Sequence, residues 1–369
     1  MSNLEDLAYG LNLGTADPIG IGSALTELAL DALSRPADLA RSWFGFGLDQ
    51  ARVGLNLASR YLGQPVTPLA EPAAGDRRFA DRAWRDNPLL ASLLETYLLA
   101  TERARATVER SRLSGSTRRK ATFGVRALSD ALAPSNVPWL NPAVLKEAID
   151  SGGLSLMRGA INCADDLLRN RGYPRQVDRA SFELGRNLAA TPGRVVFRNE
   201  LIELIAYQPQ TKQVYEQPIV CSPPWINKYY VMDLAPGRSF IEYAVKNGFL
   251  VFAISYRNPD ATMSAFTMDT YLEKGVLAAL AAAARVSGSA KVNVAGLCLG
   301  GTLTGIALAY LAANGQADRV GWATVTNTLM DFSEPGDLGA FTDEATVNKL
   351  EKQMAERGYL EAHEMAGTF

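Results

Sequence analysis

A short apolar segment that leads straight into a glycine-flanked cysteine limits this chain's possible folds more than any other feature. Residues 292–297 are mostly valine, alanine and leucine, and the sequence Cys-Leu-Gly-Gly-Thr follows at 298–302. Such a segment is typical of a buried strand, and residues 302–313 have the apolar content of a helix. Glycines stand two positions either side of Cys298, where a side chain would collide with neighbouring backbone in a sharp turn. The pattern predicts a strand, a strained turn and a helix.

A cysteine at such a turn is a candidate nucleophile. The turn places Cys298 at a helix N-terminus, whose partial positive charge favours a thiolate and the oxyanion formed after attack. The backbone N–H of Leu299 would donate to that oxyanion. Strand, Gly-x-Cys-x-Gly and helix together match the nucleophile elbow of the α/β-hydrolase fold, with cysteine replacing serine. The same short sequence also surrounds inert core cysteines by chance, and the flanking elements favour the catalytic interpretation.

Strand and helix patterns alternate through the second half of the chain. Such alternation predicts a mostly parallel sheet with helices on both faces, which fits an α/β-hydrolase fold that is incomplete at its C-terminal end. The strand segments are 194–207, 213–222, 249–256, 291–297 and 320–329, and the helical segments between them are 238–247, 268–285 and 302–313.

The first half of the chain is predicted to be helical. Apolar residues recur at three- and four-residue steps over 23–62, with Pro36 dividing two helices, and further helices are expected at 88–112, 122–132 and 142–171. A basic run from Arg110 to Lys120 is interpreted as a solvated face. The boundary between the helical and α/β parts is expected between residues 172 and 193.

Composition excludes several classes of function. The chain has 37 Lys+Arg against 39 Asp+Glu, so a net charge of −2 gives no general attraction to nucleic acid. Its three cysteines are too few and too widely spaced for a disulfide framework or a cysteine metal site. The sequence therefore favours a protein of the reducing cytoplasm without a bound metal. Cys163 and Cys221 are expected to be structural. No targeting segment is recognised, and the longest apolar stretch, 275–284, is too short to span a bilayer.

A proline-rich loop is the second candidate part of the site. The strand ending at Cys221 is followed by Ser-Pro-Pro-Trp-Ile-Asn-Lys-Tyr-Tyr at 222–230. In the α/β-hydrolase fold the loop in this position supplies the second oxyanion N–H, here assigned to Ile226. Trp225, Asn227 and Tyr229 are assigned to substrate binding. A plain proline-rich turn that packs its aromatic residues is an equally open interpretation.

A general base is missing from this pattern. The only histidine, His363, has a helical surface context, and Asp331 and Asp337 follow the last predicted strand without a further sign of catalysis. None of the three is assigned a catalytic role.

Several longer motifs resemble those of the polyhydroxyalkanoate synthases, which make storage polyester from 3-hydroxyacyl-CoA. They extend over roughly residues 70–369 and include the loop 223–230 and the sequence Gly-Leu-Cys-Leu-Gly-Gly at 296–301, here called the cysteine box. The others are Asp-Arg-Arg-Phe-Ala-Asp-Arg-Ala-Trp (76–84), Asn-Pro (87–88), Ala-Pro-Ser-Asn (133–136), Ser-Gly-Gly (151–153), Asn-Leu-Ala-Ala-Thr-Pro-Gly (187–193), Glu-Leu-Ile-Ala-Tyr (203–207) and Ser-Tyr-Arg-Asn-Pro-Asp (255–260).

The resemblance implies a helical domain at 1–180, an α/β-hydrolase core at 181–330 and the start of a cap region at 331–369. It implies transfer of an (R)-3-hydroxyacyl group from CoA to Cys298 and on to a growing polyester, with the loop and box closer to short-chain (3-hydroxybutyryl) synthases. It further implies a homodimer in the cytoplasm, at polyester granules, with no cofactor beyond the CoA thioester substrate. The family's catalytic aspartate and histidine have no counterpart here, so we expect a chain truncated at its C-terminus and of uncertain activity.

Two other functions fit parts of the sequence. A chain with an intact helical half and an unfinished catalytic half could be a non-catalytic subunit that pairs with a full-length synthase through its N-terminal helices. A cysteine hydrolase of the dienelactone type shares the elbow, although the synthase-like motifs on both sides of the elbow count against it.

Overall fold

The computed structural model describes residues 19–170 and 172–361. The chain divides into two compact units. Unit 1 comprises Met1–Gln176 with Pro335–Lys349, and unit 2 comprises Val177–Glu334 with Leu350–Phe369. In the described part of the chain, no helix is both long and apolar enough to cross a membrane.

Unit 1 is helical, as the sequence pattern predicts. Pro36 is the first residue of α3 and separates it from α2, which confirms the predicted division. Pro88 similarly begins α5, where the Asn87 side chain accepts hydrogen bonds from the first free N–H groups. The predicted helix at 142–171 is two helices, because Gly152 and Gly153 both adopt positive φ between them. The helices of unit 1 are α2 (Ile21–Leu33), α3 (Pro36–Tyr61), α4 (Ala83–Asp86), α5 (Pro88–Arg110), α6 (Gly115–Ala131), α7 (Pro142–Asp150) and α8 (Leu154–Arg169).

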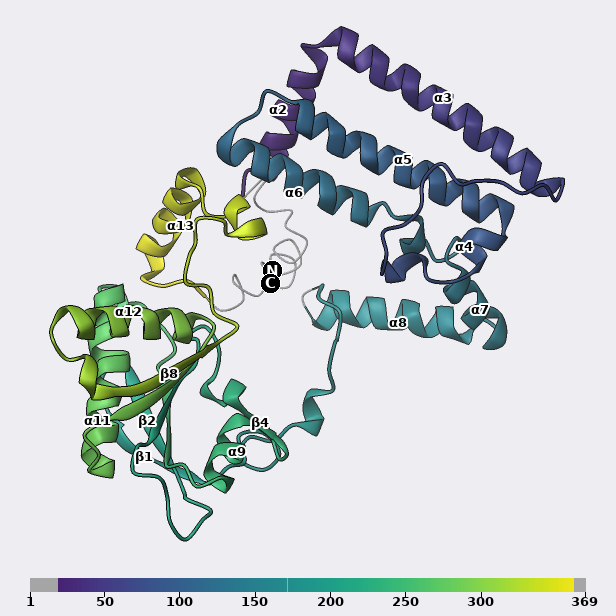
Figure 1. Cartoon of the computed structure of the whole chain (residues 1–369). Coiled ribbons are helices and arrows are strands. Elements are labelled where there is room, and N and C mark those ends of the chain that lie inside the picture. The colour runs from purple at the N-terminus through teal and green to yellow at the C-terminus, as the bar shows by residue number, and fades with distance from the viewer. Residues whose placement is uncertain (1–18, 171, 362–369) are drawn as a thin grey trace. The chain divides into compact units, whose positions relative to one another are not determined.

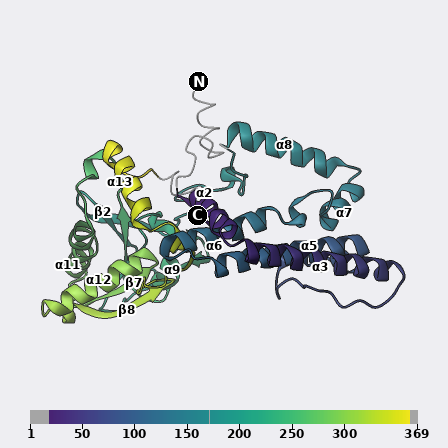
Figure 2. The same ribbon diagram turned by 90° about the horizontal axis from the view of Figure 1, so that it is seen from above.

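Two small apolar clusters hold unit 1 together. One joins α2, α5 and α6 through residues such as Leu28, Val108 and Ala121. The other surrounds Phe79 and Trp84, whose rings meet edge to face at 5.2 Å. Helix α3 runs alongside α5 in both views (Figures 1 and 2).

The interpretation of the basic run as a solvated face is wrong for its last residue. Lys120 is 7% exposed on α6, where it pairs with Asp343 and donates to Thr346 Oγ1 at 3.1 Å. The run is therefore only partly solvated, since one of its charges is neutralised inside the unit by a segment more than 200 residues away.

Unit 2 contains a six-stranded mixed sheet, which confirms the predicted fold class. Its order is β1-β2-β6-β3-β7-β8. The pairs β1–β2 and β2–β6 are antiparallel, and β6, β3, β7 and β8 are mutually parallel. The predicted strand at 194–207 is a hairpin of two strands. The bounds are β1 (Gly193–Arg198), β2 (Ile202–Tyr207), β3 (Ile219–Ser222), β6 (Val251–Tyr256), β7 (Val292–Leu297) and β8 (Val320–Thr326), beside a small pair, β4 (Asp233–Ala235) and β5 (Arg238–Ser239).

Helices cover both faces of the sheet (Figure 1). On one face α11 (Ala278–Ser287) and α12 (Leu299–Ala313) pack on alternate residues such as Val220, Phe252 and Val294. On the other, α9 (Phe240–Lys246) packs on Cys221 and Ala253. Because β3 and β7 are central and both end at the same edge, the loops that follow them lie together. The remaining helices of unit 2 are α10 (Met268–Thr270) and a π-helical segment (Tyr271–Leu277). Helix α13 (Glu344–Arg357) is divided between the units, with its residues up to Lys349 in unit 1.

Candidate active site

Cys298 occupies a strained backbone position between β7 and α12. Its φ of 54° and ψ of −124° are unfavourable for a residue with a side chain, so the surroundings must hold it in place. The Cys298 N–H donates to the carbonyl of Thr326 at 3.1 Å, and the Cys298 carbonyl accepts from the N–H groups of Gly301 and Thr302 at 2.9 and 3.0 Å. These bonds connect the turn both to β8 and to the first turn of α12.

Glycines allow the backbone around this turn to pack without gaps. A Cβ on Gly296 would lie 2.6 Å from the Cα of Gly301. One on Gly300 would lie 2.0 Å from the carbonyl oxygen of Ser222, and one on Gly301 would lie 2.0 Å from Thr328 Oγ1. Side chains at these positions would push apart the ends of β3, β7 and β8, which agrees with the steric argument made from the sequence.

Three hydroxyl side chains stabilise the turn through hydrogen bonds to backbone carbonyls. Ser222 Oγ and Thr304 Oγ1 both donate to the carbonyl of Gly300, at 3.1 and 2.7 Å, and Thr302 Oγ1 donates to the carbonyl of Leu329 at 2.8 Å. Sequence reasoning missed these supporting residues. The signal available was the position of Thr302 and Thr304 in the first turns of the helix.

The helix N-terminus supplies the electrostatics of the site. Leu299 is the first residue of α12, and the first N–H groups of a helix have no acceptor within the helix. The Leu299 N–H therefore has no acceptor within the helix, and the helix dipole favours negative charge beside Cys298. Its role as an oxyanion donor stays a prediction.

The three cysteines of the chain differ in environment. Burial raises the pKa of Cys221 to about 12, helped by the charge of Asp233, so this thiol in the core of unit 2 is inert. Cys163 is exposed on α8, within the chain's other unit. Only Cys298 combines partial exposure with a helix N-terminus.

The proline-rich loop leaves the sheet beside the elbow. Ser222, the last residue of β3, is paired with Gly296 of β7, so the loop and Cys298 follow adjacent strands at one edge. Within the loop, Pro224 accepts from the N–H of Asn227 at 3.1 Å. Asn227 and Ile226 are exposed, and the Ile226 side chain is 48% accessible. The loop therefore begins at the sheet edge that also carries Cys298, and the oxyanion and substrate-binding roles assigned to its residues stay predictions.

An aromatic group supports the Trp225 side chain. Its ring centroid lies 5.3 Å from that of Tyr271 and 6.4 Å from that of Tyr256. Burial raises the pKa of Tyr256, and the nearby Ser222 hydroxyl opposes the effect in part without reaching hydrogen-bond geometry. Tyr229 contacts Tyr230 edge to face at 5.4 Å, and burial raises its pKa. Trp225 is therefore half-buried and oriented by packing.

A buried carboxylate anchors the far end of the same loop. Asp233 is 2% exposed and accepts from Thr191 Oγ1 at 2.6 Å and from Ser239 Oγ at 2.5 Å. Its backbone carbonyl accepts from Ala189, a residue with φ of 54°. Sequence reasoning missed this anchor, although Thr191 belongs to a motif that was singled out.

A cavity of about 160 Å³ lies beside the elbow, against Gly296, Leu297 and Thr326. Its other walls come from the end of the loop and from the start of α9, including Met232 and Phe240. Pockets for drug-sized ligands measure about 300–1,000 Å³, so this one is small.

Neither aspartate after β8 is placed as a catalytic acid. Asp331 is exposed and accepts from the N–H of Ser333 at 2.8 Å, which lowers the pKa of Asp331. Asp337 belongs to unit 1, where it pairs with Arg126 at 2.5 Å. His363 lies outside the described residues. Among residues 19–170 and 172–361, no three potential metal ligands come together.

Comparison with known proteins gives a consistent result. Residues 75–244 match the family model described as poly-beta-hydroxybutyrate polymerase (PhaC) N-terminus. The chain is 37% identical over 367 residues to a poly(3-hydroxyalkanoate) polymerase of Methylorubrum extorquens, a match that covers 98% of this chain and 60% of that protein. It is 39% identical over 299 residues to poly(3-hydroxyalkanoate) polymerase subunit PhaC of Cupriavidus necator, which covers 80% of this chain and 50% of that one. The chain thus spans about half to three fifths of the length of these relatives.

Solved structures give more distant likenesses. A brefeldin A esterase is 18% identical, with a TM-score of 0.26 over 36% of this chain and 37% of its own. A putative hydrolase from Agrobacterium vitis is 16% identical, with a TM-score of 0.31 over 46% of this chain and 62% of its own.

Proposed function

This chain belongs to the poly(3-hydroxyalkanoate) polymerase family, and on that premise we propose that Cys298 carries the acyl group during polyester synthesis. The Cys298 thiolate attacks the carbonyl carbon of a (R)-3-hydroxyacyl-CoA, a tetrahedral oxyanion forms, and the CoA thiolate leaves. The product is an acyl thioester on Cys298 together with free CoA. A hydroxyl group of the next monomer or of the growing chain then attacks that thioester and regenerates the thiol.

The single observation that carries this proposal is the strained backbone of Cys298 at the N-terminus of α12. Strain of this kind persists only where surrounding structure enforces it, and it is concentrated at functional sites. The Leu299 N–H and the helix dipole stabilise the oxyanion, with the Ile226 N–H as the second donor. Exchange between two thioesters is nearly balanced in energy, so the step needs positioning and charge stabilisation more than a strong driving force.

The preference for a short acyl group rests on the resemblance of the loop 223–230 and of the sequence around Cys298 to short-chain synthases. The cavity of about 160 Å³ against Gly296 and Leu297 is not lined by Cys298 and sets no limit on the acyl chain. Trp225 is held by Tyr256 and Tyr271 and presents a rigid surface in the adjoining loop. We assign Trp225, Asn227 and Tyr229 to contacts with the acyl-CoA, and 3-hydroxybutyryl-CoA to the substrate.

The remaining assignments follow from the family. We propose a cytoplasmic protein that acts at the surface of a polyester granule, forms a homodimer and uses no cofactor or metal. No described residue is assigned as the base that would deprotonate the attacking hydroxyl. The steps assigned to this chain's described residues are therefore acylation of the Cys298 thiol and stabilisation of the oxyanion.

Incubation of the chain with (R)-3-hydroxybutyryl-CoA tests the proposal. Intact-mass and peptide mass spectrometry should find a hydroxybutyryl adduct on the peptide that contains Cys298, with release of one equivalent of CoA. Cys298→Ala should remove both signals. Cys163→Ser is the matched control, because it removes an exposed thiol from the other unit and should leave both unchanged.

Two results would contradict the proposal. An adduct on Cys163 with Cys298 unmodified would place the chemistry elsewhere. Release of CoA by Cys298→Ala at the rate of the unmodified chain would show that the elbow is not the acceptor.

A further inference from the structure

The helix that leads into α11 is wound more widely than an α-helix. Over Tyr271–Leu277 the segment is π-helical, and the N–H of Ala278 donates to the carbonyl of Glu273, five residues back. Such segments are rare, and they are frequent at functional sites. This one packs against α12, the helix that begins beside Cys298. The extra residue in the wide turn decides where Tyr271, at its start, is directed.

The turn of the β1–β2 hairpin stabilises the π-helical segment. Asn199 Nδ2 donates to the carbonyl of Lys274 at 2.8 Å, and Asn199 Oδ1 accepts from two backbone N–H groups of the hairpin. The Lys274 ammonium pairs with Glu200 of the same turn. Because Ile202 is paired with Tyr256 at the end of β6, this turn lies at the sheet edge where β3 and β7 also end.

Three rings, here called the aromatic triad, meet at this edge. The centroid of Tyr271 lies 5.3 Å from that of Trp225 and 5.7 Å from that of Tyr256, and the other two centroids are 6.4 Å apart. At these separations aromatic rings attract one another beyond the area that they bury. All three side chains are half-buried and pack against the larger core cluster of unit 2. The indole of Trp225 is thus fixed by rings from two other elements.

The hydroxyl of Tyr256 shows that the triad serves packing. This hydroxyl is buried and has no hydrogen-bond partner among the described residues, which is unfavourable for folding. A Cβ on Gly275 of the π-helical segment would lie 3.3 Å from it, so the glycine leaves the room that the phenol ring occupies. The ring is therefore kept at this place although its polar atom is unsatisfied.

The position of Trp225 affects the next residue. One planar peptide group joins Trp225 to Ile226 and carries the N–H that we assigned as the second oxyanion donor. We propose that Tyr271 is a positioning residue for acyl transfer: the π-helical segment brings its ring against Trp225, and Trp225 holds the Ile226 N–H in place. The inference rests on the function proposed above, and it gives Tyr271 no contact with the substrate.

Hydrogen exchange of the loop 223–232 in the full chain tests the inference without turnover. The N–H of Asn227 donates to the carbonyl of Pro224, and that of Val231 to the carbonyl of Lys228, so both amides report on the loop. Tyr271→Ala should accelerate their exchange at least 10-fold and leave β7 amides unchanged. Tyr271→Phe keeps the ring and should behave as the unmodified chain. If Tyr271→Phe behaved as Tyr271→Ala, the hydroxyl would be the active part and the inference would fail.

Tyr215→Ala is the matched control within unit 2. The ring of Tyr215 contacts that of Phe249 at 4.8 Å, as closely as the rings of the triad, but Tyr215 precedes β3 and so lies toward the opposite edge of the sheet. This substitution should leave the exchange of loop 223–232 unchanged. Equal acceleration by Tyr215→Ala would show that any lost aromatic pair loosens the loop, and would overturn the inference.

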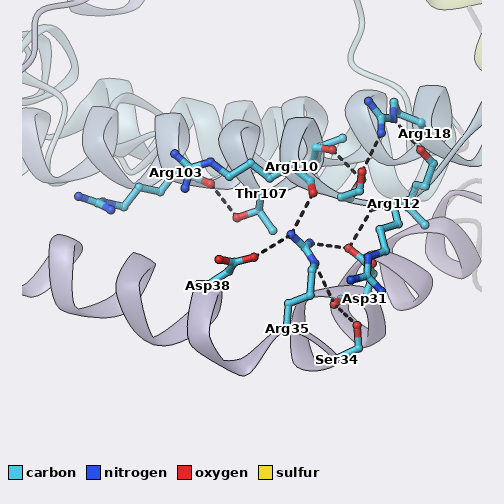
Figure 3. A network of polar contacts seen from close by, with 12 residues as sticks. Asp31, Ser34, Arg35, Asp38, Arg103, Thr107, Arg110, Arg112 and Arg118 are labelled. Carbon is cyan, nitrogen blue, oxygen red and sulfur yellow. Dashed lines mark hydrogen bonds and ion pairs between the residues drawn. The ribbon is translucent and has the colours of Figure 1, made fainter.

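A second control disturbs unit 1. The Arg35 guanidinium lies between Asp31 and Asp38, at 2.5 and 3.7 Å, and donates to the carbonyl of Arg110 at 2.9 Å (Figure 3). Arg35→Ala should destabilise unit 1 and leave the exchange of loop 223–232 unchanged. Faster exchange of the loop in this variant would mean that general loss of stability explains the effect, which would also overturn the inference.

Deletion of the exposed residue Glu273 tests the π-helical segment itself. Without the extra residue the segment becomes α-helical, and Tyr271 turns by about 100° relative to α11. Exchange of loop 223–232 should again rise at least 10-fold, with β7 amides unchanged. An unchanged loop would show that the extra residue does not place Tyr271. Faster exchange of β7 as well would show that it serves the core of unit 2, and either result would overturn the inference.

Release of CoA from (R)-3-hydroxybutyryl-CoA separates positioning from substrate binding. Tyr271→Ala should lower the rate at saturating substrate at least 10-fold, because loss of one oxyanion donor costs about 100–1,000-fold. The half-saturating concentration should change less than threefold. A rise in that concentration alone would make Tyr271 a binding residue and would overturn the inference. If the unmodified chain formed no adduct on Cys298, the proposed function would fail, whereas the exchange of the loop would still decide whether Tyr271 holds Trp225.

Discussion

Replacing Gly300 by alanine should destabilise unit 2, although the same change in most helices is stabilising. Gly300 is in the first turn of α12, where alanine has the better helix propensity by about 1 kcal/mol. Its Cβ, however, would lie 2.0 Å from the carbonyl oxygen of Ser222 and 2.6 Å from that of Pro223. Both are backbone atoms at the end of a central strand, so relief requires a shift of more than 1 Å between β3 and α12. Overpacking of this kind costs about 3 kcal/mol, which outweighs the propensity gain.

Two other glycines provide graded controls. Gly159→Ala in α8 meets no atom within 4 Å and should stabilise by about 0.5–1 kcal/mol. Gly305→Ala, also in α12, meets the sulfur of Met330 at 2.9 Å, and this flexible side chain can move aside, so the net change should be small. For each variant, the change in the free energy of unfolding is measured for the unit that contains the substitution. It should be favourable for Gly159→Ala, near zero for Gly305→Ala and unfavourable for Gly300→Ala.

Hydrogen exchange read by mass spectrometry suits this comparison, because the two units need not unfold together. A loss of 3 kcal/mol corresponds to roughly 100-fold faster exchange of β3 and α12 amides that open with the whole unit. It also corresponds to a fall of about 6–12 °C in the melting temperature of a unit of this size. If Gly300→Ala left the stability of unit 2 unchanged or raised it, the close approach of the proline-rich loop to the elbow would be refuted.

Three further results are expected. Asp343→Asn should lower the free energy of local opening of segment 335–349 by about 3–5 kcal/mol, because it leaves Lys120 buried without its partner. Hydrogen exchange of that segment at neutral pH measures this change. Burial raises the pKa of Asp343, but hydrogen bonds from Lys120 and Thr346 more than reverse this, so the stabilisation is present above pH about 4 and is lost as pH falls further through the lowered pKa. Alkylation of the native chain should modify Cys163 and spare Cys221, whose pKa is raised to about 12, until denaturant exposes it; prompt labelling of Cys221 would disprove its burial. Asp233→Asn should speed proteolysis of the loop 223–232, with no change expected in α5 peptides.

The parts of the site that the sequence predicted are those encoded locally. The strand, the turn at Cys298 and the helix are adjacent in sequence, and the glycine requirement follows from the turn itself. The position of the proline-rich loop could be predicted because carboxyl ends of parallel strands meet at one edge. By contrast, the anchors of these elements come from distant segments: Asp233 is bound by Thr191, 42 residues away, and Ser222 by Gly300, 78 residues away. No local pattern encodes such pairings.

The same reasoning explains the wrong interpretation of Lys120. A basic run is normally solvated, and only the approach of Asp343 makes burial of one of its charges possible. Pairing across 223 residues depends on the tertiary fold, because the fold alone decides which charges meet. Hydrophobic periodicity predicted that α6 would be a helix, and could not predict that a carboxylate would reach its inner face.

Helix α3 shows what periodicity alone leaves undecided. Its apolar residues form two sides: Phe46, Val53 and Leu57 are buried or half-buried. Phe44, Leu48 and Leu55, on the other side, are exposed. A search for one amphipathic face merges the two, because both repeat at three- and four-residue steps. Once α5 is seen to occupy one side, the other side has the composition of an interior and the exposure of a surface. Which of the two sides is buried depends on where α5 packs, and that is a property of the tertiary fold that the spacing of apolar residues does not encode.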